Sequence, residues 1–312
     1  MTTATKPRLS VIICTHNPDA TNLGRTLAAL RAQDLPLDQW ELLVIDNAST
    51  DPLTPRLNLD WHPAARVSRE NTLGLSHARL HGLNLSQADL IVCVDDDNLL
   101  AADYLSCALS IAETRPDLGA WGGSVEGEFT TPPEPWIKPY LYGLAIRSVR
   151  RESSHNTLAI DDSTPIGAGM IVRRRVYESY RTLCAESSLR LSLDRVGSSF
   201  SSGGDTDLAL TAIDIGLSVG VFPGLRLTHL IPARRLEAAY VARLLEGIET
   251  SSHLVLHLRD SAYRPSCPPP WAEILLRWRM RHMAPERRLI ESALIRGRRN
   301  AARQIRQLNS AA

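Results

Sequence analysis

Three short apolar runs, each followed at once by polar residues, most constrain what this chain can fold into. They are Val11–Thr15, Leu42–Asp46 and Leu90–Val94, and helical patterns at Leu23–Gln33 and Leu75–Leu85 lie between them. Short apolar strands that alternate with helices are typical of parallel sheets covered on both faces. The sequence therefore predicts the α/β class, with a doubly wound, mainly parallel sheet flanked by helices.

Polar residues gather where these expected strands end. The clusters are Thr15-His16-Asn17, Asp46-Asn47 and Asp95-Asp96-Asp97. In doubly wound sheets, ligands bind beyond the carboxyl ends of the strands. Stability alone does not require three polar clusters on one edge, so we expect a binding site there.

The pattern of strands and helices continues along the rest of the chain. We expect a strand near residues 65–68, strands and loops over 121–165, a strand at 170–172, and helices from 204 to about 215 and from 234 to 257. A Pro-rich stretch at 264–270 cannot continue a helix and is expected to be a linker. We expect residues 1–120 and 121–260 to form the two halves of one domain. Residues 261–312 would be a linker and a C-terminal helical extension.

Positive and negative charges nearly cancel over the whole chain, but they are unevenly distributed along it. The 312 residues have a formal net charge of +1, which gives no support to nucleic-acid binding. From Trp271 onward, ten Arg stand against three acidic residues, and Trp271 and Trp278 fall at helical spacing. Such a helix can lie on an anionic membrane surface or can pack its apolar side on the protein body.

Two of the three consecutive acids suit a metal ion. Alternate residues of an extended strand point the same way, so Asp95 and Asp97 would share one face. Two carboxylates suit a hard divalent cation, Mg2+ or Mn2+, that also binds phosphate oxygens. The alternative is a solvated turn or a helix cap.

Six motifs in order resemble the family 2 glycosyltransferases, which have the GT-A fold. The resemblance runs from about Leu9 to His229, over two thirds of the chain. The motifs are Val11–Asn17, Val44–Asp51, Asn71–Arg79, Val94–Asn98, Gly167–Met170 and Gly203–Leu208. Each alone is weak or moderate, and their common order makes the resemblance specific. It implies that residues 1–120 form the donor-binding half and 121–260 the acceptor and catalytic half of one domain.

The resemblance implies a donor site around Thr15, Asp46 and Arg79, which match positions that hold the nucleotide base and phosphates. An aspartate can accept from a uracil N–H, and a guanidinium can bind diphosphate oxygens bidentately. The alternatives are a turn residue for Thr15, a cap for Asp46 and a surface residue for Arg79. The other expected donor contacts are His16, which could stack on the base, Asn17, Asp95 and Asp96.

The resemblance also implies the metal ligands and the catalytic base. Asp95 and Asp97 match the family's D-x-D motif, and His229 would complete the metal shell or touch phosphate; its alternative is a structural role. Asp205 matches the general base, although Gly204 stands where the family usually has Glu, which puts acceptor contacts in doubt. Asp205 could instead be only a helix N-cap. Asp207 would orient the acceptor or pair with an Arg.

The acceptor side is expected around Gly167, Ala168 and Gly169, where small residues would allow a sugar to approach closely. Their alternative is a plain turn into the next strand. Trp121 and Trp136 could form a platform for an acceptor, since sugars offer C–H faces to aromatic rings. The alternative for each tryptophan is a core position.

We therefore expect an inverting glycosyltransferase that moves a hexosyl or related group from a nucleotide sugar, UDP-linked, to a glycan, lipid-linked, protein or small-molecule acceptor. The alternatives are a catalytically silent nucleotide-sugar binding protein and a sugar nucleotidyltransferase. A sugar nucleotidyltransferase would be expected to have a Gly-rich, basic phosphate-binding motif after the first strand, where this chain has Thr15-His16-Asn17-Pro18. The first ten residues lack the apolar core of a signal peptide, and no apolar stretch approaches the ~18 residues of a membrane span. We expect a cytoplasmic protein, with peripheral contact to the inner face of the membrane through its basic tail.

Overall fold

The structure, a computed structural model, describes residues 6–54, 56–195, 200–269, 271, 275, 278 and 280–311. The strands are β1 (Leu9–Thr15), β2 (Trp40–Asn47), β3 (Ala65–Glu70), β4 (Leu90–Asp95), β5 (Asn98–Leu100), β6 (Leu118–Phe129), β7 (Ser153–His155), β8 (Ile171–Arg173) and β9 (Ser218–Ile231). The α-helices are α1 (Ala20–Arg31), α2 (Leu75–Leu85), α3 (Tyr104–Thr114), α4 (Arg174–Glu186), α5 (Ser188–Leu191), α6 (Gly204–Asp214), α7 (Ala238–His257) and α9 (Pro285–Ala311). Short 3-10 helices cover Leu37–Gln39, Lys138–Leu144 and Ala233–Leu236.

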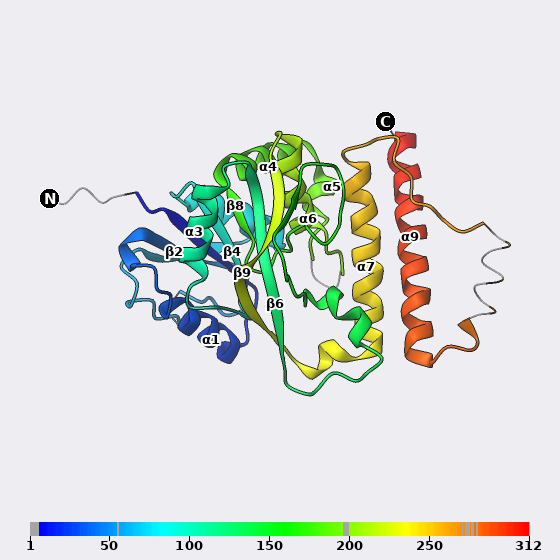
Figure 1. Ribbon diagram of the computed structural model, residues 1–312, viewed down its shortest axis with the longest axis horizontal. Coiled ribbons are helices and arrows are strands. Elements are labelled where there is room, and N and C mark those ends of the chain that lie inside the picture. Colours follow the sequence, from blue (N-terminus) through cyan, green and yellow to red (C-terminus); the bar gives the residue numbers. More distant parts are fainter. Residues whose placement is uncertain are drawn as a thin grey trace. The chain divides into compact units, whose positions relative to one another are not determined.

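The described strands form one mixed sheet in the order β3-β2-β1-β4-β8-β6-β9-β5, with β7 paired to β9 (Figure 1). The pairs β2–β3, β1–β2 and β1–β4 are parallel, as the sequence predicts. The pairs β4–β8, β6–β8, β5–β9 and β7–β9 are antiparallel. The expectation of a mainly parallel sheet therefore holds only for the first four strands. From β6 to β8 the chain passes through loops and a 3-10 helix without a long helical crossover, and antiparallel neighbours do not need one.

The parallel half of the sheet is buried on both faces, which confirms the α/β class. Alternate residues of β1 point to opposite sides: Val11 and Ile13 join a core with α1 and α3, and Ile12 joins a core with α2, α4 and α6. This double burial explains why the strands read as continuous apolar runs. The helices also begin where the sequence supports them. At α1, for example, the Asp19 carboxylate accepts the amides of Thr21 and Asn22.

The packing divides the chain into two units, which do not follow the segments expected from the sequence. Unit 1 comprises the described parts of Met1–Glu128, Ala145–Gly197 and Gly204–Leu230. Unit 2 comprises the described parts of Phe129–Leu144, Ser198–Gly203 and Ile231–Ala312. Unit 1 contains nearly all of the sheet, and unit 2 is largely helical.

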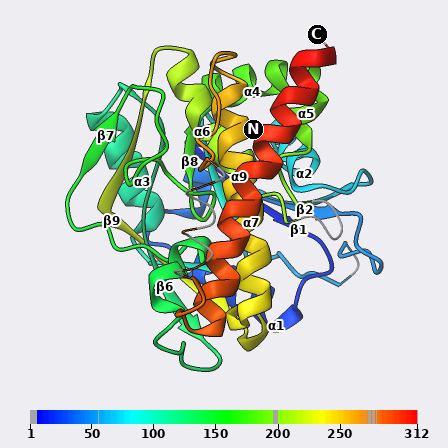
Figure 2. The ribbon, with the colours of Figure 1, turned by 90° about the vertical axis from the view of Figure 1, so that its right-hand side faces the viewer.

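Unit 2 is built on two long helices, α7 and α9, which lie side by side (Figures 1 and 2). Its buried cluster consists of Ile137, Tyr140, Val241, Ala242, Leu245, Ile290 and Ala293. Ion pairs join the helices at Arg296–Glu246 (2.9 Å) and Arg298–Glu249 (2.5 Å). The segment 200–203 is also tied to α7, since Ser202 donates its N–H to Ser251 Oγ at 3.3 Å.

The C-terminal helical extension is therefore partly a core element. On α9, Ile290, Ala293, Ala301 and Ile305 are fully buried. Before α9, Trp271, Leu275 and Trp278 are helical and exposed, so the face of the tryptophans is not the side that packs. Among the described residues, no helix combines the length and the apolar character that a bilayer crossing requires.

Candidate active site

The carboxyl ends of β1, β2 and β4 lie side by side in unit 1. The parallel register sets Thr15 opposite Asp46 and Cys14 opposite Asp95. The polar clusters that follow these strands in the sequence thus meet at one edge of the sheet. This is the edge at which ligands bind in doubly wound sheets.

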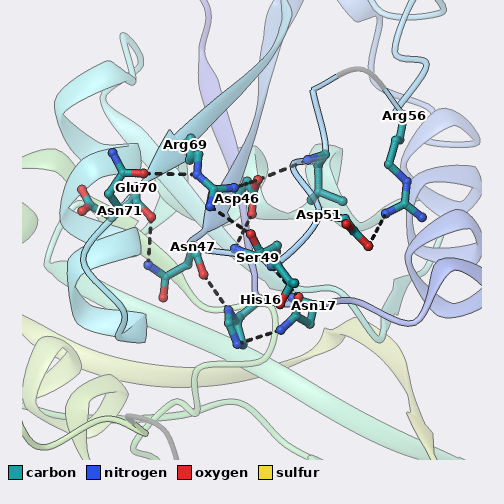
Figure 3. A network of polar contacts seen from close by, with 12 residues as sticks. His16, Asn17, Asp46, Asn47, Ser49, Asp51, Arg56, Arg69, Glu70 and Asn71 are labelled. Carbon is teal, nitrogen blue, oxygen red and sulfur yellow. Dashed lines mark hydrogen bonds and ion pairs between the residues drawn. The ribbon is translucent and has the colours of Figure 1, made fainter.

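Asp46 is fully buried at this edge, and both of its carboxylate oxygens are hydrogen-bonded (Figure 3). One accepts the Ser49 amide at 3.0 Å, and the other accepts the Leu53 amide at 3.2 Å and Arg69 Nη1 at 2.8 Å. Burial acts to raise the pKa of Asp46, but the hydrogen bonds from Ser49 and Leu53 and the charge of Arg69 outweigh burial and lower it. Asp46 is therefore the charged centre of the turn after β2, the capping role that the sequence gave as its alternative.

His16 and Asn17 tie the turn after β1 to the turn after β2 (Figure 3). His16 Nδ1 donates to the Asn47 carbonyl at 2.7 Å, which leaves Nε2 to accept Asn17 Nδ2 at 3.1 Å. The Asn17 amide donates to Ser49 Oγ at 2.9 Å. Asn17 has a φ of 47°, in the left-handed region that Asn tolerates better than most residues. These bonds fix the edges of the expected base site.

The three acids after β4 have different partners. Asp96 accepts a hydrogen bond from the Thr15 hydroxyl. Asp97 accepts Asn98 Nδ2 at 3.1 Å, and its other oxygen lies 3.3 Å from His229 Nε2. Burial raises the pKa of Asp95, and the neighbouring charge of Asp97 raises it further. The structure thus brings the expected ligands Asp97 and His229 into contact. Asp95 lies close enough for the charge of Asp97 to raise its pKa.

These acids fit a divalent cation in the chemistry of their donors. Within the described residues, no group of three or more His, Cys, Asp or Glu side chains is arranged to hold a metal ion. Mg2+ seldom needs such a cage, because it is usually held by one or two carboxylates together with substrate phosphates. A cation beside Asp95 and Asp97 would also offset the like charges that raise the pKa of Asp95.

Arg79 and Asp205 both lie next to Gly167. Arg79 on α2 is buried and lies 3.2 Å from the Asp194 carboxylate, so it is not the surface residue that the sequence offered as an alternative. Asp205, in the first turn of α6, accepts the Gly167 amide at 2.8 Å. A Cβ placed on Gly167 would lie 3.0 Å from both Arg79 Nη2 and Asp205 Cβ. The lack of a side chain at 167 therefore leaves room for both the guanidinium and the Asp205 side chain.

Ala168 and Gly169 are buried next to this pair. Gly169 has a φ of +71°, and a Cβ there would lie 2.5 Å from the Tyr104 hydroxyl oxygen. The same hydroxyl donates to the Gly169 carbonyl at 2.6 Å. The small residues expected on the acceptor side thus allow close contacts within the protein, and Gly169 is required by its backbone conformation.

Three expected site residues have other surroundings. Asp207 is fully buried and ion-paired with Arg190 at 2.5 Å, which is the pairing alternative and not an exposed acceptor contact. Trp121 is fully buried in the core, so its ring offers no platform to an acceptor. Trp136 lies in unit 2, is half-buried and donates its indole N–H to Glu134 at 2.9 Å.

Sequence reasoning missed two charged residues of the site, Arg69 and Asp194. Arg69 could have been found, because parallel pairing of the second and third strands sets it opposite Asp46. Asp194 carries no such signal: it lies between α5 and α6, outside every motif, and meets Arg79 only in the folded chain.

Comparison with known proteins gives the same family from the sequence and the same fold from the structure. Residues 10–181 match the model of glycosyl transferase family 2. The glycosyltransferase AglE of Haloferax volcanii is 31% identical over 134 residues, which cover 42% of this chain and 42% of that protein. The chain spans from 12% to 42% of the length of the four curated relatives compared.

Two solved structures share the fold. One is the mannosyltransferase PcManGT from Pyrobaculum calidifontis in complex with GDP-Man and Mn2+, with a TM-score of 0.54, 24% identity and coverage of 99% of this chain and 76% of the other. The second is S. aureus TarS 1-349 in complex with UDP-GlcNAc, with a TM-score of 0.55, 14% identity and coverage of 96% and 83%. Both are GT-A glycosyltransferases. A match over more than half of the chain, on a sheet whose strand ends carry the family's acids, shows that the chain belongs to glycosyl transferase family 2.

Proposed function

We propose that this glycosyltransferase moves a sugar from a nucleotide-sugar donor, UDP-linked, to a hydroxyl group of an acceptor, with inversion at the anomeric carbon. The observation that carries the proposal is the Asp205 carboxylate, held in the first turn of α6 by the Gly167 amide and set beside buried Arg79. A carboxylate held in this place beside the expected acceptor side can serve as a general base.

In the proposed reaction, Asp205 takes the proton of the acceptor hydroxyl while the acceptor oxygen attacks the anomeric carbon. The bond from that carbon to the diphosphate oxygen breaks, and its electron pair leaves with the nucleoside diphosphate. Attack from the side opposite the leaving group inverts the anomeric configuration. The products are the glycosylated acceptor, the nucleoside diphosphate and protonated Asp205.

The donor would bind along the edge formed by the ends of β1, β2 and β4. Thr15, His16, Asn17 and Asp46 would hold the nucleoside, and Arg79 would pair with the diphosphate. Because both Asp46 oxygens already accept hydrogen bonds, a base would share one of them with a backbone amide. The GDP-Man and UDP-GlcNAc complexes of the two similar structures support a nucleotide-sugar donor and leave two bases to compare.

Asp95, Asp97 and His229 would hold Mn2+ or Mg2+ together with the donor diphosphate. When bound, such an ion neutralises the charge that builds on the departing nucleoside diphosphate. The contact between Asp97 and His229 and the raised pKa of Asp95 support this assignment. The Mn2+ in the mannosyltransferase complex supports it by analogy.

The acceptor would approach on the side of Gly167, Ala168 and Gly169, next to Asp205. A lipid-linked acceptor agrees with the name of one relative, the glucosyl-dolichyl phosphate glucuronosyltransferase of Haloferax volcanii, which is 24% identical over 122 residues. The exposed side chains of Trp271, Leu275 and Trp278 would then bring a cytoplasmic enzyme to the inner face of the membrane.

The Asp205→Asn variant tests the base. The amide keeps the shape of the side chain but cannot take the proton, so transfer should fall by about 100- to 10,000-fold. Binding of UDP with Mn2+ should stay near the wild-type level, because the nucleotide contacts lie on other residues. Turnover can be followed without a known acceptor, as hydrolysis of UDP-GlcNAc and GDP-Man with water in its place. Asn is also a good helix cap, so hydrolysis near the wild-type rate would mean that Asp205 is only a cap.

A further inference from the structure

Asp194 is a buried carboxylate that contacts both α2 and the start of α6. Its side chain is only 6% exposed, and Oδ2 accepts Ser76 Oγ at 2.8 Å and Arg79 Nη1 at 3.2 Å. The Gly204 amide, at the start of α6, also donates to it. Asp194 thus links α2, which carries Arg79, to the first residue of the helix that carries Asp205.

The glycine at 204 is what makes room for this carboxylate. A Cβ on Gly204 would lie 2.4 Å from the Asp194 carboxyl carbon, far inside van der Waals contact. Any side chain at 204 would therefore push Asp194 away from Arg79. The Asp194 carboxylate thus occupies the space that a side chain at position 204 would fill.

Charge ties the same groups together. The pKa of Arg79 is raised well above its ordinary value, since the charges of Asp194, Asp205 and Asp95 outweigh the opposing effect of burial. Burial raises the pKa of Asp194, and Arg79 acts against that rise. Removal of either member of the Arg79–Asp194 pair would leave the other buried without its opposite charge, which is strongly destabilising.

We propose that Asp194 is a positioning residue for sugar transfer, which fixes the Arg79 guanidinium and the start of α6 and so sets the place of the Asp205 carboxylate. The proposal rests on the proposed function, in which Arg79 holds the donor diphosphate and Asp205 is the base. Asp194 itself touches neither substrate. It acts through the distance between the two groups that do.

The close approach of Gly204 provides a second test of the same contact. A Cβ at 204 would lie 2.4 Å from both the carboxyl carbon and Oδ2 of Asp194. Gly204→Ala should therefore displace the Asp194 carboxylate without removing it.

Donor hydrolysis with Mn2+ should respond in a non-additive way. Asp194→Asn keeps the shape but removes the charge, and kcat should fall by about 100-fold, the effect of a misplaced reactive group, with a smaller change in KM. Asp194→Ala should lose as much, and Gly204→Ala alone should also lose activity because its Cβ displaces the Asp194 carboxylate. Adding Gly204→Ala to Asp194→Ala should lower kcat by no more than about twofold, because the carboxylate that it displaces is already gone.

Glu41→Gln is the matched control. Glu41 is also a buried carboxylate that accepts a serine hydroxyl (Ser10, 2.6 Å), an arginine (Arg66, 2.6 Å) and a backbone amide (Gln87, 2.5 Å). It lies at the start of β2, at the opposite end of the strand from Asp46. Its variant should keep the wild-type kcat even if thermal stability falls. A wild-type kcat in Asp194→Asn, or a loss from Gly204→Ala that is as large in the Asp194→Ala background as in the wild type, would overturn the proposal.

Hydrogen exchange separates this proposal from the proposed function. Asp194→Ala should speed amide exchange in a peptide covering 204–214, whereas Glu41→Gln should leave it unchanged. If the wild type hydrolyses no nucleotide sugar, the proposed function fails, and exchange alone then decides whether Asp194 fixes α6. Unchanged exchange in Asp194→Ala would reject that role even in an active enzyme.

Discussion

Asp95, Asp96 and Asp97 follow one another in the chain, yet their side chains meet different partners. Asp96 accepts from Thr15, Asp97 lies against His229, and the pKa of Asp95 is raised by burial and by Asp97. Strand geometry predicted that the first and third acids share a face, but β4 ends at Asp95, and Asp96 and Asp97 form a turn, so it is the turn that brings Asp97 close enough to act on Asp95. The family resemblance suggested the histidine. Neither could predict Asp194, because a buried ion pair between distant loops leaves no periodic or motif signal in the sequence.

Removal of one acid should expose the metal dependence of donor binding. Without Mn2+, UDP should bind the wild type weakly, since its diphosphate would face Asp95 and Asp97 with no cation between them. With Mn2+ the affinity should rise by tenfold or more, on the order of 1.4 kcal/mol, and Asp97→Ala should abolish that gain. Calorimetry of UDP binding to both proteins, with and without Mn2+, measures the difference.

Asp89→Ala is the control for that experiment. Asp89 precedes β4, whereas Asp95 ends it, so the two acids stand at opposite ends of one strand. Its exposed side chain pairs with Lys6 at 2.7 Å, and the variant should keep the full gain from Mn2+. Equal UDP affinity in all four measurements on wild type and Asp97→Ala would refute the metal assignment.

At the scale of elements, prediction succeeded where a strand is buried on both faces. β1, β2 and β4 were expected within two residues of their observed limits, and the limits of α2 were expected at Leu75 and Leu85. The antiparallel half was not predicted as such. β5 and β7 have three residues each, too few for a pattern, and the partners of β6 and β9 depend on loops that carry no periodicity.

Two helical glycines should respond to alanine with opposite signs. Alanine normally stabilises a helix relative to glycine, and Gly24 in α1 has open space, so Gly24→Ala should raise the free energy of unfolding by about 0.5–1 kcal/mol. On α9, a Cβ at Gly297 would lie 2.8 Å from the Glu246 carbonyl oxygen and from Glu249 Cβ on α7. Gly297→Ala should therefore destabilise by about 1–3 kcal/mol, a typical cost of overpacking. Urea unfolding of both variants gives the comparison; a stabilised Gly297→Ala would show that α7 and α9 are not so closely packed.

At the scale of the whole molecule, the sequence of the tail suited two roles and could not decide between them. Apolar residues at helical spacing among arginines suit both a packed helix and a membrane-bound one. α9 packs, whereas Trp271, Leu275 and Trp278 have exposed fractions of 69%, 54% and 58%. Truncation after Pro270 would remove both and should cause aggregation, because α7 would lose its partner.

Substitution separates the two roles. Trp271→Gln/Leu275→Gln/Trp278→Gln should abolish sedimentation with phosphatidylglycerol-containing vesicles while donor hydrolysis and thermal unfolding stay unchanged. Leu158→Gln/Ile160→Gln, which alters two exposed apolar residues of unit 1, should sediment like the wild type. If the triple variant still sediments, or the wild type never does, these three side chains are not a membrane contact.

Unit 2 is assembled from three separate stretches of chain, and this sets an order for its synthesis. The ribosome releases 129–144 and 198–203 long before α9, whose buried Ile290 and Ala293 complete the same apolar cluster. Until those residues emerge, the side of α7 that they cover has no partner, while the strands and helices of unit 1 have all been translated. During this interval the sheet of unit 1 can already form, while the apolar side of α7 is still exposed because α9 has not been made. Exposed apolar surface makes a folding intermediate prone to aggregate, so the nascent protein should depend most on chaperones at this stage.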